Sequence, residues 1–132
     1  MCIRDRVGLA NPGYPSYRQI MKTLNLDPIL INTCEKNKFQ PTPSDLSRYD
    51  INGLLIASPG NPTGSMIDRE LLEALVNYCA DRKISLISDE IYHGIQYDTK
   101  ATSVAEFSDN CYIINSFSKL SLIHISEPTR LR

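Results

Sequence analysis

The sequence predicts an α/β fold, with a mostly parallel sheet and helices on both of its faces. Short apolar runs of strand length alternate with segments whose apolar residues recur at helical spacing. Residues 53–58 are a continuous apolar run, which is typical of strands buried on both faces of a parallel sheet. Polar side chains follow several predicted strand ends, where ligands bind in open α/β sheets.

The predicted strands lie at residues 7–10, 28–31, 53–58, 84–88 and 112–115. They are rich in apolar and β-branched residues and are bounded by turn and loop residues. An Asn-Pro-Gly turn at residues 11–13 ends the first strand, and a polar loop at 33–43 follows the second. Strands joined by helical segments indicate parallel pairing with right-handed crossovers.

Helices are expected in three of the connections. Ser16 is predicted to cap the first helix, whose apolar face comprises Ile20, Met21 and Leu24. A short second helix begins near Ser44. Asp68 is predicted to cap the third, with Glu70 in its first turn. Its apolar stripe is the clearest in the chain and comprises Leu71, Leu72, Leu75, Val76 and Cys79.

Composition indicates an ordinary globular protein. The 132 residues fit one domain, and 42% are hydrophobic and 22% charged. The net charge of −1 and the lack of a basic stripe argue against a nucleic-acid partner. No signal peptide or membrane-length apolar run is recognised, and the four cysteines form no CxxC pair. We therefore expect a reduced, cytoplasmic protein.

Both ends of the chain differ in character from its middle. Residues 1–6 and 121–132 resemble translated sequencing-adapter DNA, so we expect both to be non-native. The stretch from 7 to 120 is then the part that was selected to fold. We expect it to be an internal piece of a larger domain.

Three side chains that could take part in binding or catalysis follow three of the predicted strands. Asn61, Asp89 and Lys119 are separated by 28 and 30 residues, each about one βαβ unit. Because parallel strands end at the same edge of a sheet, the fold is expected to bring an amide, a carboxylate and an amine together there. Many α/β proteins share such an arrangement, so the spacing alone does not name a reaction.

The local sequence motifs indicate which protein family these residues resemble. Ser-Pro-Gly-Asn-Pro-Thr-Gly at 58–64, Ser-Asp-Glu-Ile-Tyr at 88–92 and Ser-Phe-Ser-Lys at 116–119 together resemble the fold-type I, pyridoxal-phosphate-dependent aminotransferases of classes I and II. Asn-Pro-Gly-Tyr-Pro-Ser-Tyr at 11–17 fits the segment that precedes them. The resemblance covers residues 7–120. It implies the large domain of an aspartate-aminotransferase-like fold, an amino acid and a 2-oxo acid as substrates, and a homodimeric parent protein.

The resemblance also implies roles for individual residues. Lys119 would form the Schiff base with pyridoxal phosphate and then move a proton between substrate and cofactor carbons. Asp89 would pair with the pyridine nitrogen and keep it protonated, which makes the ring a better electron sink. Without the motif set, Lys119 would be read as a surface charge and Asp89 as the cap of a turn.

Four further residues match cofactor-binding positions of the family. Asn61 and Tyr92 would donate to the phenolic oxygen of the cofactor, Tyr14 would stack on its ring and Ser116 would bind its phosphate. The plainer alternatives are a surface turn at Asn61, half-buried packing at Tyr92, core packing at Tyr14 and a strand-end cap at Ser116. The resemblance also implies cis peptides at the two Asn-Pro bonds, before residues 12 and 62.

The chain departs from the family pattern after Lys119. Glu127 stands where family members usually carry a phosphate-binding arginine, and the small domain with its carboxylate-binding arginine is not recognised. We therefore expect this chain to be inactive by itself. A metal site formed by His93 with Asp89 and Glu90 is not expected, because no second histidine lies nearby.

Other functions fit the same residues. A β-lyase, a decarboxylase or a cyclopropane-forming synthase would keep the cofactor and change the reaction. The same fold also serves as an effector-sensing domain in some transcription regulators, in which case a basic helix-turn-helix would precede it. The last alternative is an unrelated α/β protein in which these motifs arise by chance.

Overall fold

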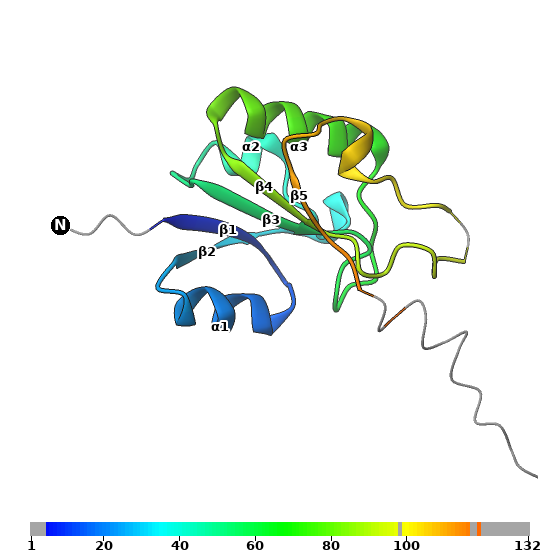
Figure 1. Ribbon diagram of the computed structural model, residues 1–132, viewed down its shortest axis with the longest axis horizontal. Helices are drawn as coiled ribbons and strands as arrows, with labels where there is room; N and C mark the ends of the chain where they lie inside the picture. The colour runs from blue at the N-terminus through cyan, green and yellow to red at the C-terminus, as the bar shows by residue number, and fades with distance from the viewer. Residues whose placement is uncertain (1–4, 98, 117–118, 120–132) are drawn as a thin grey trace, which may run out of the picture.

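The computed structural model describes residues 5–97, 99–116 and 119, and the other residues are left aside. The described chain folds around one sheet with the strand order β2-β1-β3-β4-β5 (Figure 1). The strands are β1 (Arg6–Asn11), β2 (Asp27–Asn32), β3 (Gly53–Ala57), β4 (Ser85–Asp89) and β5 (Tyr112–Ile114). Every neighbouring pair is parallel, which confirms the predicted α/β class.

Helices cover both faces of this sheet, as the sequence predicts (Figure 1). One face carries α1 (Pro15–Thr23), and the opposite face carries α2 (Pro43–Leu46) and α3 (Arg69–Arg82). Two short 3₁₀ helices, η1 (Glu35–Asn37) and η2 (Val104–Glu106), complete the described elements. The described residues contain no helix that is both long and apolar enough to cross a membrane.

The core is divided in two by the sheet. Successive residues of a strand point to opposite faces, so Leu54 and Ile56 pack under α2 and α3, while Leu55 packs under α1. The face under α1 is completed by Val7, Leu9 and Met21. Both faces of β3 are thus buried, which confirms the interpretation of the apolar run at residues 53–58.

The third helix follows its predicted stripe closely. Leu72, Leu75, Val76 and Cys79 are buried in the larger part of the core, and Leu71 is partly buried. Asp68 occupies the N-cap position, but its side chain forms no capping hydrogen bond. It accepts instead from Lys38 Nζ at 2.6 Å. An exposed ion pair with a lysine distant in the sequence is thus found where the sequence predicts a helix cap.

The beginning of α1 differs from the prediction, whereas α2 begins close to its predicted position. Pro15 begins α1 and Tyr14 is its N-cap, so Ser16 lies inside the first turn and is not the cap. Proline is favoured at this position because its fixed φ suits the first helical turn. The second helix, α2, begins at Pro43, next to the predicted Ser44. The side chain and backbone of Thr42 form a reciprocal capping box with Asp45 there.

The buried face of α1 also differs from the predicted one. Ile20 and Leu24 are 55% and 65% exposed, whereas Met21 is buried. Tyr17, four residues before Met21, packs beside it against the core. Tyr17 and Met21 therefore form the buried side of α1, while Ile20 and the C-cap residue Leu24 are exposed. The adapter-like stretch at 121–132 and residues 1–4 lie outside the described residues.

Leu75→Ala should reveal the contribution of the larger part of the core. Leu75 is fully buried, so its truncation leaves a cavity and should lower the free energy of unfolding by about 2–5 kcal/mol. Glu73→Ala, an exposed substitution in the same helix, should change it by less than about 0.5 kcal/mol. Urea unfolding of the full-length protein measures both; equal effects would contradict the packing of α3.

Candidate functional site

Strand register brings the ends of three strands to one level. Ala57 is paired with Asp89, and Asp89 with Ile114. Two backbone hydrogen bonds extend this alignment past the strands. Ser58 N–H donates to the Asp89 carbonyl oxygen at 3.2 Å, and Glu90 N–H donates to the Ile114 carbonyl oxygen at 2.9 Å. The segments that follow β3, β4 and β5 therefore leave the sheet from the same edge.

Asn61 lies in a closed turn after β3. Gly64 N–H donates to the Gly60 carbonyl oxygen at 2.7 Å, and Gly60 N–H donates to the Ser65 carbonyl oxygen at 2.8 Å. Gly64 has a φ of +67°, which glycine adopts without strain. The peptide bonds before Pro12 and Pro62 are cis, as predicted, and the bond between Ser58 and Pro59 is a third cis bond that was not predicted.

Asp89 is held at the end of β4 by two donors. Its carboxylate is buried, with only 8% of the residue exposed. Ile91 N–H donates to Oδ1 at 3.0 Å, and the Tyr17 hydroxyl donates to Oδ2. Burial raises the pKa of Tyr17, and the hydrogen bond to Asp89 raises it further, so the hydroxyl remains a donor. The carboxylate is therefore oriented from both sides of the strand end.

Tyr17 is a site residue that the sequence analysis missed. It lies one helical turn after Tyr14, and the two rings pack edge to face with centroids 5.3 Å apart and planes at 84°. Tyr14 itself is 42% exposed. The sequence feature that could have identified Tyr17 is its three-residue spacing from Tyr14, which puts both side chains on one side of α1. Their contact links the predicted stacking residue to the group that holds Asp89.

Asn61 lines two neighbouring pockets at this edge of the sheet. It lines a small pocket together with Tyr14 and Tyr17, and a larger cavity of about 520 Å³ together with Tyr92 and Met66. The structure thus brings together four predicted site residues: Tyr14, Asn61, Tyr92 and, through Tyr17, Asp89.

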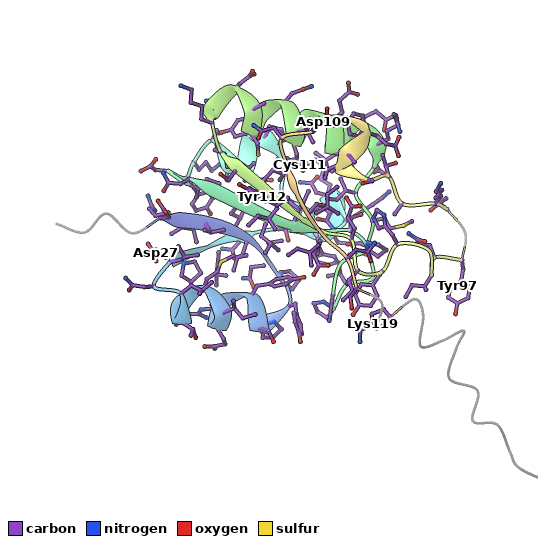
Figure 2. The ribbon with its side chains drawn as sticks, viewed as in Figure 1. Asp27, Tyr97, Asp109, Cys111, Tyr112 and Lys119 are labelled. Atoms are coloured by element: carbon purple, nitrogen blue, oxygen red, sulfur yellow. The ribbon has the colours of Figure 1, made fainter. Side chains whose placement is uncertain are left out.

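The other two predicted residues lie after β5. Lys119 is exposed and lies beyond the carboxyl end of that strand (Figure 2). Ser116 is half-buried, and its N–H donates to Asn115 Oδ1 at 2.7 Å. Residues 117 and 118, which complete their motif, lie outside the described residues. Among the residues that are described, no group of three or more histidine, cysteine or acidic side chains could hold a metal ion.

Comparison with known proteins identifies the family. The family model described as aminotransferase class I and II matches residues 1–121. The chain belongs to this family. This confirms the resemblance drawn from the motifs at residues 58–64, 88–92 and 116–119.

Individual class I and II aminotransferases agree with this assignment. The chain is 43% identical over 119 residues to the valine–pyruvate aminotransferase of Mycobacterium tuberculosis, covering 87% of this chain and 31% of that protein. A crystal structure of an aminotransferase from Mycobacterium tuberculosis has a TM-score of 0.83 and 39% identity, covering 90% of this chain and 34% of that one. The structure of aspartate aminotransferase from Thermus thermophilus with maleate has a TM-score of 0.80 and 26% sequence identity. This match covers 87% of this chain and 31% of that one.

The share of each relative that is covered shows how much of such a protein this chain represents. The chain spans about a third of the length of each relative. Its five parallel strands and flanking helices are part of an aspartate-aminotransferase-like domain, as the sequence analysis expected.

Tyr17→Phe should weaken the site without disturbing the ring packing. The variant removes one donor to a buried carboxylate, which should lower the free energy of unfolding by about 1–3 kcal/mol. The pKa of Tyr17 is raised in the folded state. The stabilisation that its hydroxyl provides is therefore fully present below the unfolded pKa of about 10, and it is lost only as the pH rises through the folded pKa.

The difference between native protein and Tyr17→Phe should therefore stay constant between about pH 6 and pH 9. Urea unfolding of the cofactor-free protein across this range measures it. Tyr14→Phe serves as the control, and we expect it to behave like the native protein. A Tyr17→Phe variant as stable as that control would show that the hydroxyl does not hold Asp89.

Proposed function

We propose that the complete protein is a pyridoxal-phosphate-dependent aminotransferase that moves an amino group between an amino acid and a 2-oxo acid. Residues 7–120 would form part of its cofactor-binding large domain. The observation that carries the proposal is the arrangement at one sheet edge, in a chain of this family. Asn61 and Tyr92 line one cavity there, and Tyr17, which shares a pocket with Asn61, holds the buried Asp89 carboxylate. A homodimer is proposed on the family resemblance, and a cytoplasmic location on the scattered cysteines, which form no CxxC pair.

The donor set fits the polar groups of pyridoxal phosphate. Asp89 is an acceptor, and its two recorded donors leave lone pairs free for a protonated pyridine nitrogen. Asn61 and Tyr92 line the same cavity and offer an amide N–H and a hydroxyl to an anionic oxygen. Tyr14 exposes part of its ring at the neighbouring pocket, as a stacking residue requires.

Each residue then has a limited task. Pyridoxal phosphate supplies an electron sink when bound, and the protein supplies attachment, orientation and charge. Asp89 would hold a proton on the pyridine nitrogen, and Tyr17 would keep the carboxylate oriented for this through its hydrogen bond to Oδ2. Lys119 Nζ would attach the cofactor, and its free amine would be the group that holds and moves a proton during transamination. Its exposure in this chain agrees with a domain whose remaining parts would enclose it.

Reduction with borohydride tests the attachment. In the full-length protein incubated with pyridoxal phosphate, we expect mass spectrometry of the digested protein to find the reduced adduct on Lys119. Lys119→Ala should lose the adduct, whereas Lys100→Arg, a change at an exposed lysine, should keep it. An adduct on a different lysine would refute the assignment of Lys119.

Asp89→Asn tests the role of the carboxylate. The amide cannot keep the pyridine nitrogen protonated, so kcat for transamination should fall by about 10²-fold or more. Steady-state assay of the full-length protein measures this loss, and the borohydride adduct on Lys119 should still form. Unchanged kcat would mean that Asp89 serves only the fold.

A further inference from the structure

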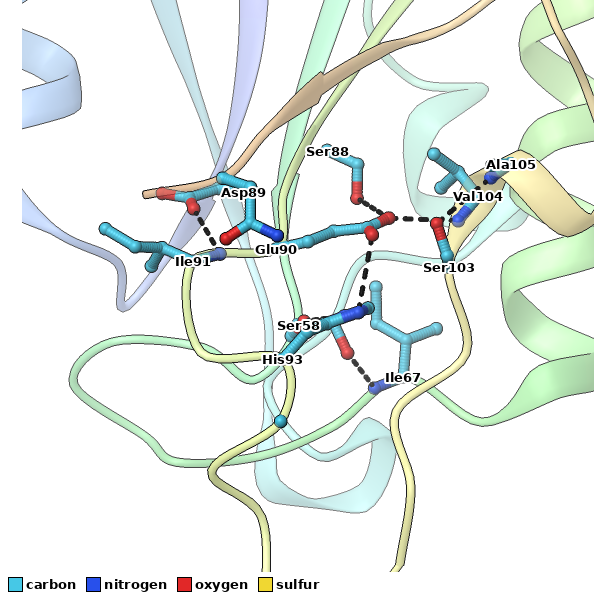
Figure 3. A network of polar contacts seen from close by, with 12 residues as sticks. Ser58, Ile67, Ser88, Asp89, Glu90, Ile91, His93, Ser103, Val104 and Ala105 are labelled. Atoms are coloured by element: carbon cyan, nitrogen blue, oxygen red, sulfur yellow. Dashed lines mark hydrogen bonds and ion pairs between the residues drawn. The ribbon is translucent and has the colours of Figure 1, made fainter. Parts of the chain in front are cut away.

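A second carboxylate is buried directly beside Asp89. Glu90 is only 4% exposed, and two donors converge on its Oε1 (Figure 3). The Ser88 hydroxyl donates at 3.1 Å, and the Val104 N–H donates at 3.0 Å. Because consecutive residues of an extended chain point to opposite faces, Asp89 serves the face of α1 while Glu90 is anchored on the other.

His93 continues this network across to the end of β3 (Figure 3). Its Nδ1 lies 3.3 Å from Glu90 Oε2, and its Nε2 lies 2.9 Å from the Ser58 carbonyl oxygen. Ser58 is fixed in turn, because its hydroxyl accepts from Ile67 N–H at 3.0 Å and its own N–H donates to the Asp89 carbonyl oxygen. The imidazole ring therefore bridges the segments that leave β3 and β4.

The two ring nitrogens of His93 both face oxygens, and this determines where hydrogens must lie. A carbonyl oxygen only accepts, so Nε2 carries a hydrogen. In a neutral ring, Nδ1 would then be an acceptor that faces the Glu90 carboxylate, and two acceptors repel each other. One additional proton on Nδ1 would turn this contact into an ion pair. At 3.3 Å the Nδ1–Oε2 contact is longer than a typical charge-assisted hydrogen bond and has the separation of an ion pair.

We propose that Glu90 and His93 form a proton-sharing clamp whose function is to position the cofactor contacts. Glu90 follows Asp89, His93 follows Tyr92, and Ser58 precedes Asn61 by three residues. One clamp thus fixes the relative positions of the three groups that we assign to the pyridine nitrogen and the phenolic oxygen. The inference rests on the proposed function. Glu90 and His93 are positioning residues, since they act on the cofactor through their neighbours.

The chemistry of the clamp distinguishes between substitutions at the same position. Glu90→Gln keeps an oxygen for Ser88 and Val104 and offers an amide N–H to a neutral His93, so the clamp should close without the extra proton. Glu90→Met preserves much of the volume but removes both functions. His93→Phe keeps a ring and loses both contacts. Ser88→Ala removes one donor only and provides a milder variant that keeps the backbone contacts of Glu90.

The absorbance of the cofactor bound to Lys119, measured against pH in the full-length protein, reports on this positioning. Donors to the phenolic oxygen lower the proton affinity of the lysine–cofactor bond, so displaced donors raise the midpoint of the spectral transition. We expect His93→Phe and Glu90→Met each to raise it by about 0.5–1 pH unit, and Ser88→Ala to raise it less. Glu90→Gln should remain near the native midpoint. Asp109→Asn, an exposed loss of charge, is the control and should not move it.

The double variant Glu90→Met with His93→Phe should shift the midpoint no further than either single variant, because both break one clamp. Native midpoints in Glu90→Met, His93→Phe and Ser88→Ala, or a shift in Glu90→Gln equal to that in Glu90→Met, would overturn the clamp. If the native full-length protein forms no adduct at Lys119, the proposed function fails and this inference with it. An adduct with unmoved midpoints overturns the clamp alone.

Discussion

The parallel register of β3, β4 and β5 is the constraint on which the rest of this structure depends. It sets Ala57, Asp89 and Ile114 side by side, so each following segment starts from the same edge. A slip by one residue would exchange the faces to which Leu54 and Leu55 point, and both faces are buried. Apolar packing far from the edge therefore determines which polar groups meet there.

The end of β4 shows how two adjacent acids acquire different tasks. Asp89 lies on the side of α1, where a tyrosine hydroxyl and a backbone N–H orient it but leave acceptor capacity. Glu90 lies on the other side, where Ser88, Val104 and His93 use both of its oxygens. The alternation of an extended backbone separates the two carboxylates, which would otherwise repel at short range. Asp89 thus keeps acceptor capacity for a ligand, whereas Glu90 contacts three different segments of the chain.

Much of the fold could be predicted because it depends on local patterns. The five strands and the buried stripe of α3 are visible in the periodicity of apolar residues, and the strand ends then place Asn61 and Asp89. The parts that could not be predicted depend on partners distant in the sequence. Tyr17 meets Asp89 across 72 residues, and Lys38 reaches Asp68 across 30. No short-range pattern reports such contacts, so a helix cap was expected where an ion pair is found.

We propose that this sheet edge holds one cofactor between Asp89 and Lys119. A crystal structure of the full-length protein grown with pyridoxal phosphate tests it most directly. We expect electron density continuous with Lys119 Nζ, with the Asp89 carboxylate within hydrogen-bonding distance of the pyridine nitrogen and Asn61 and Tyr92 at the phenolic oxygen. Cofactor density that is attached elsewhere, or that leaves Asp89 bonded only to Tyr17 and Ile91, would contradict it.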